Sequence, residues 1–150
     1  MSKDIRIGLI SGSLRKASFN TQLVQYVGKR AKEMGGVELV TIDLNQLDLP
    51  MFSEDLETDG LPQSALDLKE LMISCDAFLI STPEYNGSIS GMRHVRQILT
   101  QLQTFVIPQE YALGSAHQAF DENSDLKDEK AASFAASVGA ETVRVCQKLK

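Results

Sequence analysis

A polar ten-residue segment carries the residue types that point most clearly to chemistry. Residues 11–20 read SGSLRKASFN and follow directly on an apolar run. If a helix begins here, its unpaired amides and partial positive charge favour a bound anion. The hydroxyls of Ser13 and Ser18 and the guanidinium of Arg15 could then donate hydrogen bonds to a phosphate. In the alternative interpretation, Ser18 or Asn20 only caps the helix and the cations face water.

Other phosphate-binding motifs fit this segment less well. The chain has no GxxxxGK[ST] motif, and Gly8 and Gly12 lack the GxGxxG spacing that a dinucleotide pyrophosphate requires. Asp43 could imitate the ribose-binding acid of a dinucleotide fold, but we interpret it as a residue of an ordinary turn. A monophosphate is the ligand that these residues favour.

A second polar loop occupies residues 82–91, which read TPEYNGSISG. A proline, an Asn-Gly pair and a further glycine predict a tight loop. Its backbone amides and the side chains of Tyr85 and Asn86 could line a flat ligand with polar edges. A serine hydrolase is disfavoured, because Ile89 stands where the G-x-S-x-G motif needs its nucleophile.

The surrounding elements place both loops at the same edge of a sheet. Apolar runs predict four strands, at residues 5–10, 37–42, 77–82 and 104–107. Each strand is followed by a helical stripe of apolar residues, and the last stripe is interrupted by Gly139, with Asp128 as a possible N-cap. Such alternation predicts an α/β fold with a doubly wound parallel sheet, which binds ligands beyond the carboxyl ends of its strands.

Composition limits the possible functions. The 150 residues, 43% of them hydrophobic, fit one domain spanning residues 1–150. A net charge of −5 argues against nucleic acid as a partner. No apolar run approaches the roughly 20 residues of a membrane span, and the charged first residues do not resemble a signal peptide, so we expect a cytoplasmic protein. Cys75 and Cys146 are expected to be reduced and partly buried, without a metal site.

Together the two loops resemble those of the NAD(P)H-dependent FMN reductase family, the flavodoxin-like group that includes bacterial quinone, azo and chromate reductases. The segments GSLRKASFN and TPEYNGSISG carry the resemblance, and weaker similarity covers nearly the whole chain. The resemblance implies FMN as cofactor and NADPH or NADH as co-substrate. It implies hydride transfer through the flavin to a quinone-like or other small acceptor. The alternative is a flavodoxin-like protein that binds FMN or a phosphate without productive NAD(P)H turnover.

The resemblance also implies a role for individual residues. The FMN phosphate would be held by Ser13, Arg15, Ser18 and Asn20, with backbone contacts from the residues between them, Leu14, Lys16, Ala17 and Phe19. The ribityl chain and the ring edge would be lined by Pro83, Glu84, Tyr85, Asn86 and Gly87. Tyr85 is our candidate for a residue near both flavin and acceptor. A homodimer or homotetramer is implied too, with the last helices helping to build the subunit boundary.

The chain departs from the family pattern directly after Gly91. Relatives continue with an LKNAIDW-like helix and a further buried strand, so about one α/β unit, on the order of 30 to 40 residues, is missing here. One account is a shortened, four-stranded sheet where the family has five strands, with residues 104–107 paired beside residues 77–82. In the other account, the sequence given omits a segment of a longer protein. The phosphate pocket would survive, but one wall of the ring site would be lost.

Overall fold

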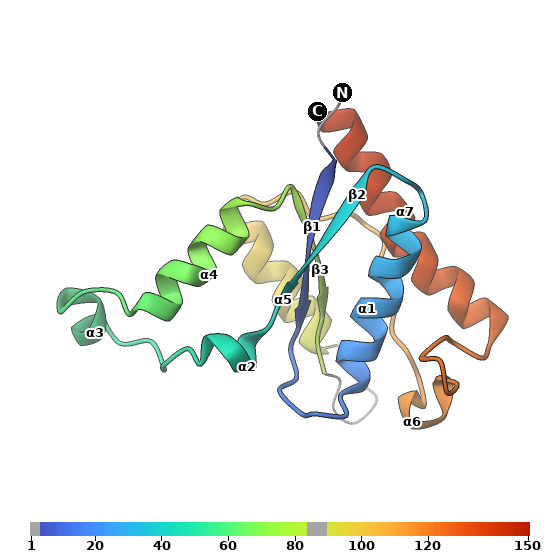
Figure 1. The fold of residues 1–150 in the computed structure, drawn as a ribbon, viewed down its shortest axis with the longest axis horizontal. Coiled ribbons are helices and arrows are strands. Elements are labelled where there is room, and N and C mark those ends of the chain that lie inside the picture. The colour runs from blue at the N-terminus through green and yellow to red at the C-terminus, as the bar shows by residue number, and fades with distance from the viewer. Residues whose placement is uncertain (1–3, 84–89) are drawn as a thin grey trace.

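The computed structural model describes residues 4–83 and 90–150, which contain a three-stranded parallel sheet (Figure 1). The strands are β1 (Ile5–Ser11), β2 (Val37–Ile42) and β3 (Ala77–Ser81), in the order β2-β1-β3. Residue Ile7 of β1 stands opposite Leu39 of β2 and Ala77 of β3. Three of the predicted strands, and the α/β class, are therefore confirmed.

Two long helices cover one face of this sheet (Figure 1). They are α1 (Phe19–Lys32) and α7 (Glu129–Leu149), and α7 begins at Asp128, whose carboxylate accepts from the Ala131 amide at 2.7 Å. The buried core is formed by the strand residues that face these helices, together with helix residues such as Val27, Ala31 and Val143. Burial of these side chains supplies most of the driving force for folding.

Gly139 does not interrupt the last helix, contrary to our expectation, because α7 runs continuously through it. A Cβ atom at this position would lie 2.7 Å from the carbonyl oxygen of Val27 and 3.3 Å from the Cβ of Ala31. The glycine is therefore a contact residue that lets α7 approach the backbone of α1.

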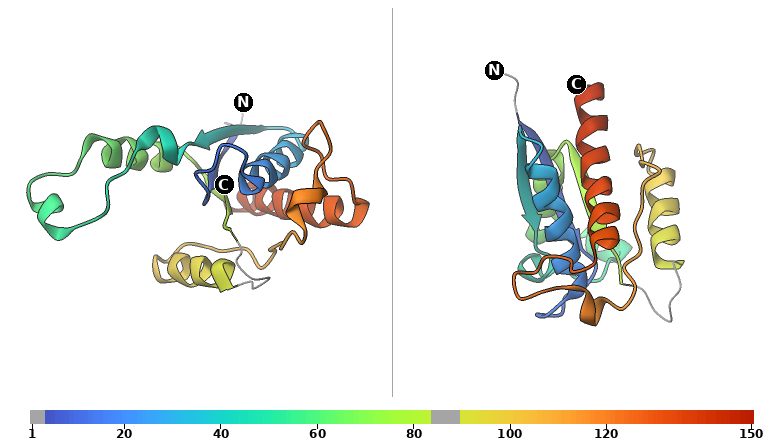
Figure 2. Two further views of the ribbon diagram at one scale, coloured as in Figure 1. Left: turned by 90° about the horizontal axis from the view of Figure 1, so that it is seen from below. Right: turned by 90° about the vertical axis from the view of Figure 1, so that its right-hand side faces the viewer.

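The remaining helices lie outside this layer. They are α2 (Leu44–Leu47), α3 (Glu54–Thr58), α4 (Gln63–Ile73), α5 (Ser90–Gln101) and α6 (Ala116–Ala119). The amphipathic stripes predicted α4 and α5 but not the three short helices. Figure 2 shows that α5 stands apart from the sheet, and that α2, α3 and the start of α4 form a projecting arm. In the described part of the chain, no helix is both long and apolar enough to cross a membrane.

The predicted fourth strand, at residues 104–107, does not form. Its first residue, Thr104, is bound to the end of α5 instead. The amide and the hydroxyl of Thr104 both donate to the Leu99 carbonyl, at 3.1 and 2.6 Å. Pro108 then ends the segment and has no amide to donate. Only three residues remain between them, the lower limit of strand length, and they pair with no strand of the described sheet. β3 consequently has β1 as its single neighbour in the described sheet.

Both cysteines are free and partly buried, as expected. Cys146 lies on α7, where burial raises the pKa of its thiol and so keeps it protonated at neutral pH.

Candidate functional site

The loop between β1 and α1 lies at the carboxyl end of the sheet and is fastened to the end of β3. The amide of Gly12 donates to the Ser81 carbonyl at 2.8 Å, and the Ser81 hydroxyl donates to the Asn20 carbonyl at 2.9 Å. A Cβ atom on Gly12 would lie 3.0 Å from the Ser81 carbonyl oxygen and 3.1 Å from Cδ of Pro83. The two predicted ligand loops therefore begin side by side.

The amino end of α1 is capped by Ser18 and still offers free amides. The hydroxyl oxygen of Ser18, a residue only 4% exposed, accepts from the Thr21 amide at 3.3 Å. Asn20 lies inside the helix and does not cap it. Among the described residues, the backbone amides of Phe19 and Asn20 have no acceptor, and the first turn contains no acidic side chain. The cap is thus real, and it leaves the positive end of the helix available to an anion.

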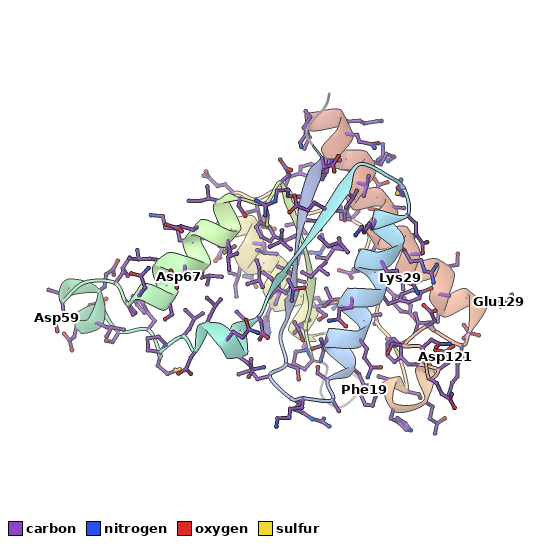
Figure 3. All side chains as sticks on the ribbon, in the orientation of Figure 1. Phe19, Lys29, Asp59, Asp67, Asp121 and Glu129 are labelled. Carbon is purple, nitrogen blue, oxygen red and sulfur yellow. The ribbon has the colours of Figure 1, made fainter. Side chains whose placement is uncertain are left out.

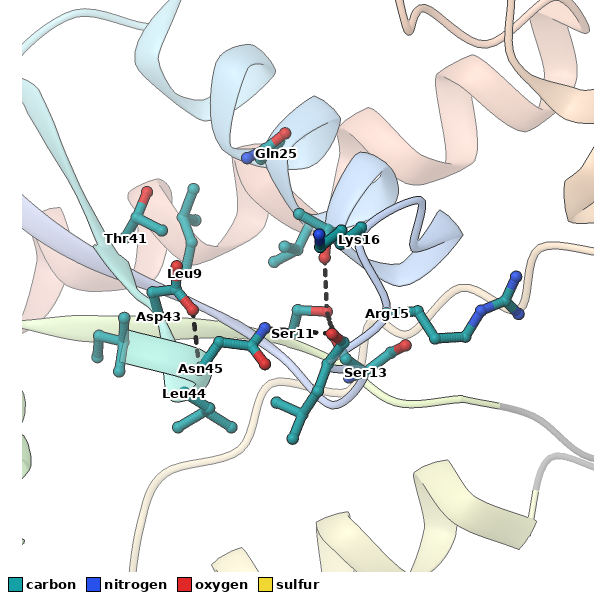
Figure 4. Close-up of a pocket in the computed structure, with 14 residues that line it drawn as sticks. Leu9, Ser11, Ser13, Arg15, Lys16, Gln25, Thr41, Asp43, Leu44 and Asn45 are labelled. Carbon is teal, nitrogen blue, oxygen red and sulfur yellow. Dashed lines mark hydrogen bonds between the residues drawn. The ribbon is translucent and has the colours of Figure 1, made fainter. Parts of the chain in front are cut away.

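A cavity of about 260 Å³ opens between this loop and the carboxyl end of β2 (Figure 4). Nine of its 14 lining residues have hydroxyl, amide or charged side chains: Ser11, Ser13, Arg15, Lys16, Thr21, Gln25, Thr41, Asp43 and Asn45. They come from four places in the sequence, namely β1 with its loop, α1, β2 and the start of α2. The order of the strands brings these places together.

Hydrogen bonds fix the polar groups of this cavity in place. The Thr21 hydroxyl donates to the Ser11 hydroxyl oxygen at 3.0 Å, and the Asn45 side-chain amide donates to the Leu14 carbonyl at 3.2 Å. The Asp43 carboxylate accepts from the backbone amide of Asn45 at 2.9 Å. Figure 4 shows Arg15 extending away from Asp43 and Asn45, so its guanidinium is free to meet a ligand outside the cavity.

The predicted site residues fall into three groups. Ser13, Leu14, Arg15 and Lys16 line the cavity. Ala17 is exposed in the loop, Ser18, Phe19 and Asn20 start α1, and Pro83 packs against Gly12. Glu84, Tyr85, Asn86 and Gly87 lie outside the described residues.

Two further lining residues, Asp43 and Asn45, were not among the predicted site residues. Asp43 does sit in a turn, as the N-cap of α2, but it and Asn45 also form a wall of the cavity. The signal available was the position of Asp43 directly after a strand that neighbours β1, because such positions meet at one edge of a parallel sheet.

Comparison with known proteins identifies the family. Residues 5–93, more than half of the chain, match the family described as NADPH-dependent FMN reductase. The chain belongs to this family. The strand order β2-β1-β3 agrees, because it is the first part of the flavodoxin-like order 2-1-3-4-5.

Several curated FMN reductase and quinone reductase sequences are similar to the chain. An NAD(P)H-dependent FMN reductase of Pseudomonas aeruginosa is 28% identical over 87% of this chain and 89% of that protein. A probable NADPH:quinone oxidoreductase of Oryza sativa is 37% identical over 59% of this chain, and a quinone reductase of Pseudomonas putida is 32% identical over 61%. These matches span only 44% of the rice protein and 47% of the P. putida protein.

A solved structure supports the fold. The flavoenzyme NAD(P)H:(acceptor) oxidoreductase FerB of Paracoccus denitrificans superimposes with a TM-score of 0.77 over 96% of this chain and 98% of its own, at 24% identity. The similarity shows a shared FMN reductase-type α/β fold.

The comparisons also bear on the segment that we expect to be missing after Gly91. The family match ends at Arg93, two residues beyond that point. The alignment with the P. aeruginosa protein extends over 169 positions, although 87% of the 150 residues is only about 130. About 40 positions of that alignment therefore have no counterpart in this chain, close to the 30 to 40 residues expected for one α/β unit.

Proposed function

We propose that this chain is an FMN-dependent NAD(P)H oxidoreductase that delivers electrons to a quinone-like or other small acceptor. The observation that carries the proposal is the amino end of α1, which presents free amides behind a loop containing Ser13, Arg15 and Lys16. Membership of the FMN reductase family and the names of its quinone reductase relatives support the same assignment.

The residues present fit the phosphate of FMN. In the described chain the Ser13 hydroxyl donates to no protein group, and the Ser18 hydroxyl keeps its proton available because it acts only as an acceptor in the cap. No acid stands in the first turn of α1 to repel a dianion. Gly12 permits the close approach of the loop to the end of β3. These groups could bind a phosphate through both hydrogen bonds and charge.

When bound, FMN would supply the two-electron chemistry, taking hydride from the nicotinamide and passing electrons to the acceptor. The chain's own residues bind and orient. Ser13, Arg15, Ser18 and Asn20 would hold the phosphate at the β1–α1 loop, and Pro83 would begin the wall that faces the rest of the cofactor. We assign the remainder of that wall to Glu84, Tyr85, Asn86 and Gly87, with Tyr85 beside the acceptor.

A second function is favoured by the width of the sheet. The described sheet ends at β3, so a loop from a further strand, which would complete the ring site in the family, is not found there. The alternative is therefore a flavodoxin-like protein that holds FMN, or only a phosphate, without NAD(P)H turnover.

Parallel titrations with FMN and riboflavin test the phosphate site, because riboflavin lacks the phosphate, and a turnover assay separates the two functions. Quenching of flavin fluorescence reports binding, and NAD(P)H consumption on addition of a quinone reports turnover. The enzyme should bind FMN at least about tenfold more tightly than riboflavin, since a charge-assisted contact contributes about 1.5 to 3 kcal/mol. Binding without turnover would favour the alternative, and failure to bind FMN would contradict both functions that involve the flavin.

The remaining attributes are also proposals. We assign residues 1–150 to a single FMN-binding domain, expect a homodimer or homotetramer, and expect the cytoplasm as its location. The structural support for one domain is the single buried core shared by β1, α1 and α7.

A further inference from the structure

Ser81, the last residue of β3, places a hydroxyl where the pattern of the strand calls for an apolar side chain. It lies on the same face of β3 as Ala77 and Leu79, and Leu79 belongs to the buried core. Ser81 is itself only 8% exposed. Among the described residues, buried serines and threonines occur at only three positions, Ser18, Ser81 and Thr142. A buried hydroxyl is costly unless it has a hydrogen-bond partner, so the partner of Ser81 is informative.

Both ends of the loop between β1 and α1 are bound to Ser81. At the start of the loop, the Gly12 amide donates to the Ser81 carbonyl at 2.8 Å. At its end, the Ser81 hydroxyl donates to the Asn20 carbonyl at 2.9 Å. Residues 13–19, which lie between these two contacts, include the side chains that we assign to the phosphate. A single residue of β3 therefore holds both ends of the candidate phosphate loop.

The peptide group between Asn20 and Thr21 is held on both sides. Its carbonyl accepts from the Ser81 hydroxyl, and its N–H donates to the hydroxyl oxygen of Ser18 at 3.3 Å. Hydrogen bonds in such a chain polarise and strengthen one another. Two of the three buried hydroxyls thus meet on one peptide group, in the first turn of α1.

This peptide group lies next to the groups that are free to bind an anion. Because Ser18 accepts the Thr21 N–H, its own proton remains available, as do the backbone amides of Phe19 and Asn20 in the described chain. Figure 3 shows Phe19 at the end of α1 that lies beside the carboxyl end of the sheet. The bond from Ser81 therefore fixes the orientation of the helix end at which we place the phosphate.

We propose that Ser81 is a positioning residue of the phosphate site. Its hydroxyl does not contact the phosphate but holds the first turn of α1 so that Ser18 and the free amides face the same anion. The inference rests on the proposed function, because it concerns the same phosphate. Thr82 and Pro83 follow Ser81 directly, so the residue that holds the phosphate loop also begins the second ligand loop.

The substitution Ser81→Ala tests this role, since it removes the hydroxyl and keeps the carbonyl that binds Gly12. The dissociation constant for FMN should rise about three- to tenfold, the effect of losing one hydrogen bond, whereas the constant for riboflavin should stay unchanged. Quenching of flavin fluorescence measures both. Ser81→Thr keeps a hydroxyl and should bind FMN as the wild type does. An equal change for both flavins in Ser81→Ala, or a loss as large in Ser81→Thr, would overturn the proposal.

Thr142→Val is the matched control for the loss of a buried hydroxyl. Thr142 is 6% exposed, and its hydroxyl donates to the Val138 carbonyl within α7 at 2.9 Å, the same distance as in the Ser81 bond. Both Thr142→Val and Ser81→Ala should lower the urea midpoint, but only Ser81→Ala should change the ratio of the FMN and riboflavin dissociation constants. An equal change of this ratio in Thr142→Val would attribute the effect to stability alone and contradict the proposal.

A titration with inorganic phosphate at constant ionic strength separates this role from the flavin chemistry. In proton–nitrogen correlation spectra of the flavin-free chain, the amide signals of Phe19 and Asn20 should shift with phosphate. Ser81→Ala should need about three- to tenfold more phosphate for the same shift. This result would stand even if the FMN-loaded chain failed to oxidise NAD(P)H, a failure that contradicts only the proposed function. Equal phosphate dependence in both proteins would overturn the role of Ser81 and leave the proposed function intact.

Discussion

At the residue scale, Ser18 caps α1 and is still free for the second task that the sequence presented as an alternative, anion binding. Its oxygen accepts from the Thr21 amide and caps α1, which leaves its proton free to donate to a phosphate. The amides of Phe19 and Asn20 remain without an acceptor among the described residues. Capping and anion binding are therefore compatible, because they use different atoms of the same helix end.

Arg15 is the residue whose removal should affect the phosphate most selectively. Its side chain is exposed and extends from the loop, so Arg15→Ala should leave the fold intact. We expect FMN binding to weaken by about 1 to 3 kcal/mol, the contribution of a charge-assisted hydrogen bond. A flavin fluorescence titration measures this, with Lys32→Ala, at the opposite end of α1, as the charge-matched control. Equal affinity for the Arg15 variant and wild type would exclude Arg15 from the site.

Asp125 should make stability depend on pH. Its carboxylate accepts hydrogen bonds from Lys29 at 3.0 Å and Arg30 at 3.1 Å, and the Lys29 bond is the main reason that its pKa lies below the ordinary value of 3.8. A depressed pKa contributes stability above pH 3.8 that is lost as the pH falls through the lower value of the folded state.

The substitution Asp125→Asn should therefore lower the urea midpoint at neutral pH and have little effect in strong acid, where the wild-type carboxylate is already protonated. Asp59→Asn, at an exposed carboxylate on the arm, serves as the control. An equal loss for Asp125→Asn at both pH values would show that the ion pair is not the cause.

At the element scale, the hydrophobic pattern correctly predicted the strands and helices that depend on local sequence. Three strands and the long helices follow from apolar runs and stripes, and Asp128 capped α7 as expected. The prediction of a strand at residues 104–107 was wrong, because Thr104 hydrogen-bonds to the end of α5. Its β-branched side chain favours a strand and gave no sign of this contact. Gly139 was misread because its contact is with α1, far away in the sequence. Asp43 was undervalued for the same reason, since its neighbours in the cavity depend on strand order.

Replacing Gly139 tests the close packing of α7 on α1. In an isolated helix, Gly→Ala is favourable, but here the new Cβ would lie 2.7 Å from the Val27 carbonyl oxygen. We expect Gly139→Ala to lower the free energy of unfolding by about 1 to 3 kcal/mol, as overpacking does. Urea unfolding measures it, and Ser133→Ala, exposed on the same helix, should instead be neutral or gain up to about 0.5 kcal/mol. A stabilised Gly139 variant would mean that the helices can separate without loss.

At the scale of the whole molecule, one half of the family fold is well formed and the other is open. α1, α7 and one face of the sheet enclose the core next to the β1–α1 loop. Beyond β3 the described sheet has no further strand, and about 40 positions of the alignment with the P. aeruginosa relative have no counterpart. The loop that should bind phosphate belongs to the well-formed half. We therefore expect the open half to decide whether a bound flavin can also turn over.

The most direct test of the proposed oxidoreductase is an anaerobic NADPH titration of the protein reconstituted with FMN, followed by flavin absorbance. The proposal predicts that the flavin remains with the protein on gel filtration, is bleached by NADPH faster than free FMN, and regains its absorbance when a quinone is added. A protein that does not retain FMN, or that retains it without accelerated bleaching, would contradict the proposal.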